Sequence, residues 1–192
     1  IGIATFIIKE AQNLNFAMPV DLIKEKIGSK KITSLRDAEI EDYEKTAEYW
    51  FYVGVAYGEA GMYKEALEAF KQAIRIKPDY AEAHYNLGVT YGKLGMYREE
   101  IEAYKQAIRI KPDYADAHYN LGVTYGRLGM WREAKEAYKR AIRIKPDDAE
   151  AHYNLGVTYL ILKDKGSALE EYKILKNLNP ELANELFNLI YK

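Results

Sequence analysis

The sequence contains no cysteine. This excludes a disulfide framework, a thiolate metal site and a cysteine nucleophile, and it leaves the redox compartment open. The sequence also lacks an apolar run of roughly 18 residues, which a membrane-spanning helix needs, so we expect no membrane insertion. An excess of positive charge is missing too, because 28 Lys and Arg residues face 29 Asp and Glu residues. Binders of nucleic acid or of anionic membranes need such an excess, so we expect neither partner.

What the sequence has in abundance is repetition. Residues 81–114 and 115–148 begin with AEAHYNLGVTYG and ADAHYNLGVTYG, and they differ at only 7 of 34 positions. Looser copies occupy 47–80 and 149–182. A fixed period of this length is typical of supersecondary units that stack on one another. The four segments are called repeats 1 to 4 below, in chain order.

Each repeat carries the pattern of two helices joined by a short turn. Apolar residues recur at helical spacing over about 14 residues, a glycine follows, and a second periodic stretch ends near a proline. The turn glycines are Gly61, Gly95 and Gly129, and the prolines are Pro78, Pro112, Pro146 and Pro180. The pattern predicts an all-α fold, an α-solenoid of four helix–turn–helix repeats. We expect an entry helix within 34–46 and a capping helix at 183–192 with an apolar stripe of Leu182, Leu186, Leu189 and Ile190.

The residues at matching places in the repeats resemble the tetratricopeptide repeat family. The fourth place holds Trp50, His84, His118 and His152, and the seventh and eighth hold Val53-Gly54, Leu87-Gly88, Leu121-Gly122 and Leu155-Gly156. The eleventh holds Tyr57, Tyr91, Tyr125 and Tyr159, and the twenty-fourth holds Phe70, Tyr104, Tyr138 and Tyr172. Two departures stand out. Glu100 replaces a small residue, and we expect it to lean towards solvent. Lys163 replaces the turn glycine.

The resemblance implies a right-handed α-solenoid with a concave groove lined by the first helix of every repeat. It also implies which residues face a ligand in that groove. That set is Phe51, Val55, Glu59, Tyr85, Val89, Lys93, Tyr119, Val123, Arg127, Tyr153 and Val157. Tyrosine offers a large contact area at low entropic cost, which favours a protein or peptide ligand. Alternatively, the tyrosines support neighbouring helices. Asn86, Asn120 and Asn154 are interpreted as bonding backbone between repeats.

No cofactor or metal site is expected. The three histidines are 34 residues apart, one in each of repeats 2 to 4, so they cannot converge on one ion, whose ligands lie about 2 Å from it. We therefore interpret them as packing residues. The glycines of the repeats recur at 34-residue spacing, and they form no phosphate-binding loop.

The segment 1–33 precedes the repeats and has a different pattern. IGIATFII (1–8) and LNFAMP (14–19) predict a β-hairpin, and a short helix follows at 20–27. Residues 1–27 resemble the C-terminal end of trypsin-like serine proteases of the high-temperature-requirement type. The resemblance implies that the catalytic residues lie before Ile1, so we expect a fragment that is not an enzyme and carries no catalytic residue. The alternative is an ordinary capping hairpin and helix.

Three functions remain open on this evidence. The first is an interaction scaffold that binds an extended or helical peptide, as the C-terminal arm of a protease-like protein. The second is a piece of a peptidase that is inactive alone. The third is self-assembly into a homo-oligomer through the apolar N-terminus or the C-terminal stripe. The compartment stays open: cytoplasmic, or extracytoplasmic if the parent is a secreted protease.

Overall fold

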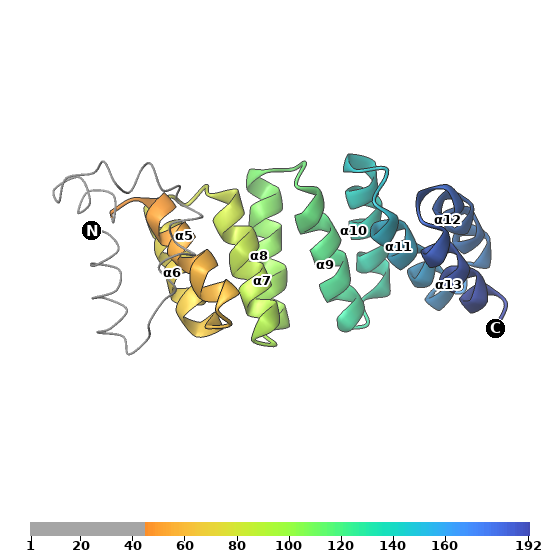
Figure 1. Cartoon of the computed structure of the whole chain (residues 1–192), viewed down its shortest axis with the longest axis horizontal. Coiled ribbons are helices and arrows are strands. Elements are labelled where there is room, and N and C mark those ends of the chain that lie inside the picture. Colours follow the sequence, from red (N-terminus) through yellow and green to blue (C-terminus); the bar gives the residue numbers. More distant parts are fainter. Residues whose placement is uncertain (1–44) are drawn as a thin grey trace. The chain divides into compact units, whose positions relative to one another are not determined.

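A computed structural model describes residues 45–192, and every regular element in that range is an α-helix (Figure 1). The helices are α5 (Ala47–Glu59), α6 (Tyr63–Ile76), α7 (Ala81–Lys93), α8 (Tyr97–Ile110), α9 (Ala115–Arg127), α10 (Trp131–Ile144), α11 (Ala149–Ile161), α12 (Lys165–Leu178) and α13 (Pro180–Ile190). The predicted all-α class is confirmed for this range. None of these helices is both long and apolar enough to cross a lipid bilayer. The predicted hairpin, the helix at 20–27 and nearly all of 34–46 lie outside the described residues.

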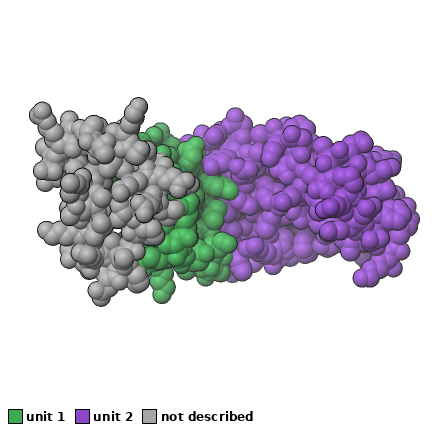
Figure 2. Space-filling model, in the orientation of Figure 1, with its two compact units in different colours: residues 1–95 green, residues 96–192 purple. Residues whose placement is uncertain are grey.

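The chain divides into two compact units, which Figure 2 colours separately. The division falls after Gly95, so α5, α6 and α7 belong to unit 1 and the remaining six helices belong to unit 2. Helix α5 in unit 1 begins with a capping hydrogen bond, in which the amide of Tyr49 donates to the Thr46 hydroxyl at 3.1 Å. Thr46 has an extended backbone, so α5 starts here as a new helix.

Unit 1 is built on a close contact between α5 and α6. The ring of Phe70 on α6 is only 2% exposed, and a Cβ atom placed on Gly54 of α5 would lie 2.7 Å from it. Only glycine leaves room for this ring, so the glycine at the eighth place of the repeat sets the spacing of the helix pair. The second helix of repeat 1, α6, also packs on α7, the first helix of repeat 2.

Unit 2 continues the same scheme over six helices. Each helix from α8 to α13 packs on its neighbour in the sequence, with α9 against α10 as one of the most extensive contacts. The core at its C-terminal end consists of Tyr138, Leu155, Tyr159, Leu175 and Leu186, with small alanines between them. The alternation of large and small side chains lets the helices approach and still fills the interior.

The turns inside the repeats require a left-handed backbone. Gly61, Gly95 and Gly129 have φ angles of 75°, 74° and 72°. Glycine adopts this conformation without steric cost. In repeat 4 the same place is held by Lys163 with a φ of 64°. A side chain there is strained, because its Cβ crowds the backbone.

The prediction that Glu100 leans towards solvent is wrong. Glu100 is 4% exposed and lies in unit 2, where burial raises the pKa of its carboxyl. Hydrogen bonds with Thr124 and Tyr104 and the charge of Arg127 lower that pKa only in part. Thr124 also donates to the Asn120 carbonyl at 2.9 Å, so its single hydroxyl proton has two acceptors. One carboxyl oxygen of Glu100 finds no partner among the described residues. Glu100 is thus one of the buried residues of α8, together with Ile101, Ala103, Tyr104 and Ala107.

The last helix begins three residues earlier than the predicted capping helix, at Pro180. Its N-terminus is capped by the Asn179 side chain, which accepts from two backbone amides. Leu186 and Ile190 are buried, while Leu189 is 44% exposed, so only part of the predicted stripe faces the core. Leu186 occupies the space opposite Gly156 that Phe70 fills in repeat 1, since a Cβ on that glycine would lie 2.5 Å from it. The capping helix therefore completes the interior of repeat 4.

Candidate functional site

The predicted ligand-facing residues of unit 1 lie on α5 and α7, the first helices of repeats 1 and 2, which contact each other. The first helix of a repeat is called a first-type helix below. Phe51 and Val55 on α5 and Tyr85 and Val89 on α7 are half-buried. These four residues are called the first strip. Glu59 and Lys93 are exposed, at the last positions of the same two helices. The structure thus brings the unit 1 residues together on two adjacent helices, with the charged members at the helix ends.

The ring of Phe51 is held by other rings on two sides. Its centroid lies 6.0 Å from that of Phe70 and 5.0 Å from that of Tyr80. The Lys77 ammonium lies 4.8 Å above the Tyr80 ring and 3.7 Å from the Glu48 carboxylate. Sequence reasoning missed Tyr80. Its signal was present, because tyrosine follows Lys-Pro-Asp in repeats 1 and 2, and Lys111 lies at the same 4.8 Å from the Tyr114 ring.

The first strip has open space beside it. Gly58 follows Phe51 and Val55 on the same face of α5, at the spacing of one and two helical turns. A Cβ atom on Gly58 would meet nothing within 4 Å. A ligand backbone or a side chain can therefore approach the helix closely at this point.

The predicted residues of unit 2 form a second strip on α9 and α11, which also contact each other. Its members are Tyr119, Val123, Tyr153 and Val157, all half-buried against the unit 2 core. The glycine at the twelfth place of repeat 3, Gly126, has less open space beside it than Gly58 has in repeat 1. A Cβ on Gly126 would lie 3.2 Å from the Trp131 ring, so this ring already covers the helix.

The hydroxyl of Tyr119 links repeat 3 to repeat 4. It donates to the Glu150 carboxylate at 3.2 Å and accepts from the Asn154 amide at 3.0 Å. Burial and then the Glu150 charge raise the pKa of Tyr119 to about 12. The interpretation that the asparagines bond backbone between repeats was partly wrong. Asn154 does bond across to repeat 3, but its partner is the Tyr119 side chain. Asn86 does bond a backbone carbonyl, but it is that of Glu82 in its own helix, at 2.8 Å.

Tyr153 repeats the arrangement one repeat further on. Burial raises the pKa of its hydroxyl, and the charge and hydrogen bond of Glu185 on α13 raise it further. Both tyrosine hydroxyls form a hydrogen bond with a glutamate on a later helix: Tyr119 with Glu150 on α11, and Tyr153 with Glu185 on α13. The rings therefore have a supporting role between helices, and their exposed faces remain as apolar surface.

Arg127 completes the predicted unit 2 residues at the end of α9. It is exposed, and its guanidinium lies 6.0 Å above the Tyr97 ring. Its positive charge also acts on the buried Glu100 carboxyl. Arg127 thus contributes to the α8–α9 contact as well as to the edge of the second strip.

The three histidines make the same structural contact in each repeat. The Nε2 atoms of His84, His118 and His152 lie 2.9, 3.0 and 3.0 Å from the carbonyls of Pro78, Pro112 and Pro146. Burial lowers the pKa of His118, and nearby Arg140 and Arg143 lower it as well. Across residues 45–192 no group of three metal-ligating side chains lies close enough to hold an ion.

Comparison with protein families identifies the repeat type. The TPR repeat model matches residues 54–95 and 97–129, and tetratricopeptide repeat models match 115–148 and 137–170. These matches give no support to the protease resemblance of residues 1–27, which stays a prediction. No curated protein gives a significant match.

Solved structures share the fold. A crystal structure of MamA is 28% identical, covers 76% of this chain and 85% of its own, and has a TM-score of 0.69. A second MamA crystal structure is also 28% identical, with coverage of 86% and 88% and a TM-score of 0.65. YrrB, described as a TPR protein with an unusual peptide-binding site, is 22% identical over 96% of this chain and 97% of its own, with a TM-score of 0.69. The helical-repeat solenoid fold is therefore shown.

Proposed function

Because the chain belongs to the tetratricopeptide repeat family, we propose that it is an interaction scaffold that binds protein segments on the two strips of its first-type helices. Such scaffolds act by binding, and we expect no catalysis by residues 45–192. One observation carries the proposal. In each unit, half-buried aromatic and valine side chains lie on two adjacent helices, and in unit 2 they pack against the core.

A surface held in this way is suited to binding. The ring of Phe51 is fixed by Phe70 and Tyr80, and the ring of Tyr119 is fixed by its two hydrogen bonds and by Tyr138 at 5.9 Å. Side chains that are already ordered lose little entropy when a ligand binds. The surface area that stays exposed is apolar, and contact with it removes water from both partners.

Each strip favours its own kind of ligand segment. The first strip has open space at Gly58, which leaves room for a bulky side chain or for close backbone approach. The second strip is flatter, because Trp131 covers Gly126, and the exposed Glu150 lies beside Tyr119. We expect an apolar segment on the first strip and an apolar segment with a basic neighbour on the second.

The biological setting follows from the sequence of 1–33 alone. We propose that the repeats form the C-terminal arm of a protease-like protein, supported by the resemblance of residues 1–27 in sequence. A Gly-x-Ser-Gly-Gly motif about a dozen residues before Ile1 in the parent gene would support this setting, and its absence would contradict it. A peptidase assay of this chain alone should show no turnover, whether or not the motif is found.

The test of binding uses a phage-displayed library of random dodecapeptides selected on the full chain. Two variants introduce charge into the strips: Val55→Lys with Val89→Lys for the first, and Val123→Lys with Val157→Lys for the second. Glu68→Lys on the exposed side of α6 is the control, because it changes the net charge by the same amount as either pair. Valines are chosen because truncating Tyr119 would also remove its hydrogen bonds to repeat 4.

The expected result is that peptides selected on the chain keep their affinity for Glu68→Lys and lose roughly tenfold or more for at least one valine pair. Circular dichroism melting must show that the valine variants still fold. If both pairs bind the selected peptides as the unaltered chain does, the strips are not the binding surface and the proposal is wrong.

A further inference from the structure

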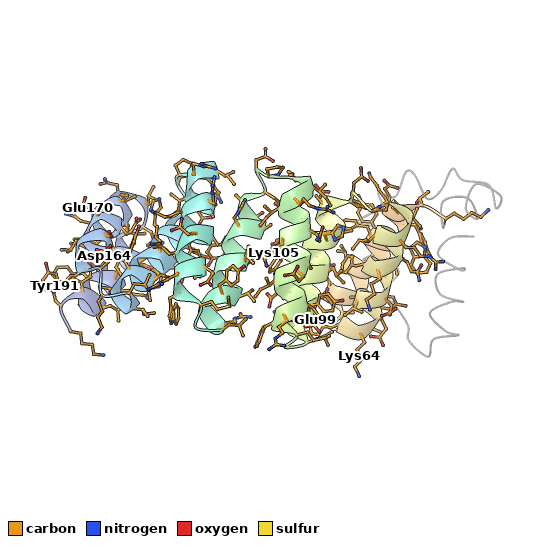
Figure 3. The ribbon with its side chains drawn as sticks, turned by 180° about the vertical axis from the view of Figure 1, so that it is seen from behind. Lys64, Glu99, Lys105, Asp164, Glu170 and Tyr191 are labelled. Atoms are coloured by element: carbon orange, nitrogen blue, oxygen red, sulfur yellow. The ribbon has the colours of Figure 1, made fainter. Side chains whose placement is uncertain are left out.

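Three aromatic rings lie in a row at the C-terminal end of unit 2. The centroids of Tyr172 on α12 and Phe187 on α13 are 5.4 Å apart, and those of Phe187 and Tyr191 are 4.6 Å apart. Phe187 is 41% exposed and Tyr191 is 60% exposed, and Tyr172 is half-buried. Figure 3 labels Tyr191, at the end of the chain that also holds Asp164 and Glu170. The three rings are called the aromatic row.

The packing of the repeats does not require this exposure. The aromatic residues that hold the place of Tyr172 in the other repeats, Phe70, Tyr104 and Tyr138, are only 2 to 4% exposed. In repeat 4 Leu186 takes the space beside Gly156, and the Tyr172 ring lies against Phe187 instead. Contiguous exposed apolar surface of this kind marks interaction sites more often than isolated apolar residues do.

Two lysines bracket the row. The Lys165 ammonium lies 4.6 Å from the Tyr191 ring centroid, and the Lys176 ammonium lies 5.9 Å from that of Tyr172. Cation–π contacts of this kind position the ammonium groups at the two ends of the row. No carboxylate within the described part of the chain pairs with either lysine, whereas Lys173 on the same helix lies 2.6 Å from Glu170. The ammonium groups of Lys165 and Lys176 can therefore donate hydrogen bonds to a ligand.

The spacing of the lysines defines a ligand. They are separated by three turns of α12, which is about 16 Å at 1.5 Å per residue. An extended chain advances about 3.3 Å per residue, so residues five positions apart span the same length. A carboxylate at each end would meet one ammonium in a charge-assisted hydrogen bond. An apolar side chain midway would lie on Phe187.

We propose that the aromatic row binds an extended acidic segment of a partner protein, with two acidic residues five positions apart and a large apolar residue between them. Charge complementarity selects this occupant, because the row ends in two lysines without carboxylate partners. The surface is formed by residues of α12, of α13 and of the segment after it, and none of them belongs to either strip. The proposal therefore does not depend on the proposed function of the strips.

The test is a titration of the full chain, labelled with ¹⁵N, with the peptide acetyl-Glu-Ala-Phe-Ala-Ala-Glu-amide, followed by nuclear magnetic resonance. We expect shifts at α12 and α13, and weaker binding as ionic strength rises from about 50 to about 300 mM. Lys165→Glu with Lys176→Glu should weaken binding roughly tenfold or more. Lys173→Glu is the control on the same helix, matched in charge to each single variant, Lys165→Glu and Lys176→Glu, and it should have little effect. Tyr191→Ser provides a second variant that removes an exposed ring without opening the core.

Several outcomes would overturn the proposal. One is equal binding by the double lysine variant, and another is equal binding of a peptide with glutamine in place of both glutamates. Shifts confined to the two strips would assign the peptide to those surfaces and remove the row from consideration. Sedimentation at increasing concentration checks the remaining occupant: an oligomer that the double lysine variant dissociates would mean that a second copy of the chain covers the row.

Discussion

The imidazole Nδ1 atom of His152 lies 2.6 Å from a carboxylate oxygen of Glu171, in the interior of repeat 4. The other repeats hold a buried alanine at the place of Glu171, namely Ala69, Ala103 and Ala137. Burial alone lowers the pKa of His152, but the Glu171 hydrogen bond, the Pro146 carbonyl and the charges of Glu171 and Asp148 together raise it above its ordinary value. Repeat 4 therefore contains a contact between α11 and α12 that depends on pH.

The first prediction concerns Glu171→Gln. The folded-state pKa of His152 is raised, so the stabilisation by the pair is complete below the unfolded-state pKa of about 6.5 and is lost as the pH rises through the folded-state pKa. The variant should lose about 2 kcal/mol of unfolding free energy at pH 5.5, the range for a hydrogen bond to a charged group, and less at pH 8.5. Urea unfolding at the two pH values measures this. An equal loss at both would show that the protonation of His152 does not change between the two pH values, which would contradict the prediction.

The second prediction concerns Glu100. Its folded-state pKa is raised above the ordinary value of 4.5, so the protonated form suits the folded chain and stability falls as the pH rises from about 4.5 through the folded-state pKa. Glu100→Gln removes this loss and keeps the shape of the side chain. We expect the variant to gain about 1–2 kcal/mol at pH 7 and little at pH 4.

The converse substitution in repeat 3 is the control for Glu100. Ala134 holds the same place and is fully buried. Ala134→Glu should destabilise the chain by several kcal/mol at pH 7, because it places a carboxyl in a filled interior (about 3 kcal/mol or more). A neutral result for Glu100→Gln across the pH range would mean that the carboxyl is well solvated.

The sequence predicted the helices well because the repeats supply four copies of one pattern. Apolar periodicity, the glycine turns and the prolines indicated two helices in each repeat, and the structure has two helices in each. Tyr80 could also have been found, from the Lys-Pro-Asp-Tyr ending shared by repeats 1 and 2. These features are local or periodic, so they can be read along the chain.

Side-chain direction was harder to predict from the pattern. Glu100 was placed in solvent because glutamate is rarely buried, but α8 fixes its direction at the place where other repeats hold alanine. The aromatic row was missed because it depends on Leu186 of α13 lying beside Gly156 of α11, a contact between residues that are 30 positions apart. Such contacts follow from how helices pack, and no motif along the chain encodes them.

The third prediction concerns the turn of repeat 4. Lys163 has a φ of 64°, where a residue with a Cβ carries a cost of roughly 1 kcal/mol. Lys163→Gly should therefore raise the unfolding free energy by about 0.5–1 kcal/mol, since glycine gains more entropy on unfolding and offsets part of the relief. Thermal and urea unfolding measure the change. Gly129→Lys, in the matching turn of repeat 3, should destabilise by a similar amount. A gain in that variant would contradict the strain argument.

The fourth prediction uses two glycines inside first-type helices. A Cβ on Gly58 meets nothing within 4 Å, whereas one on Gly122 would lie 2.7 Å from the Tyr138 ring. Gly58→Ala should stabilise the chain by up to about 1 kcal/mol through helix propensity. Gly122→Ala has the same propensity gain, but it should destabilise by about 2 kcal/mol or more, because the ring is only 4% exposed and has nowhere to move.

A second substitution separates the clash at Gly122 from any effect on the backbone. Tyr138→Leu shortens the side chain opposite Gly122 and should lower stability when it is made alone, since it leaves a cavity. Made together with Gly122→Ala, it should cost less than the sum of the two single changes, because the new methyl group fills part of the space that the ring leaves. A double-mutant cycle by urea unfolding gives this coupling energy. Additive losses would show that the effects of the two substitutions on stability are independent. The contact of Gly122 with the Tyr138 ring would then not explain the spacing of α9 and α10.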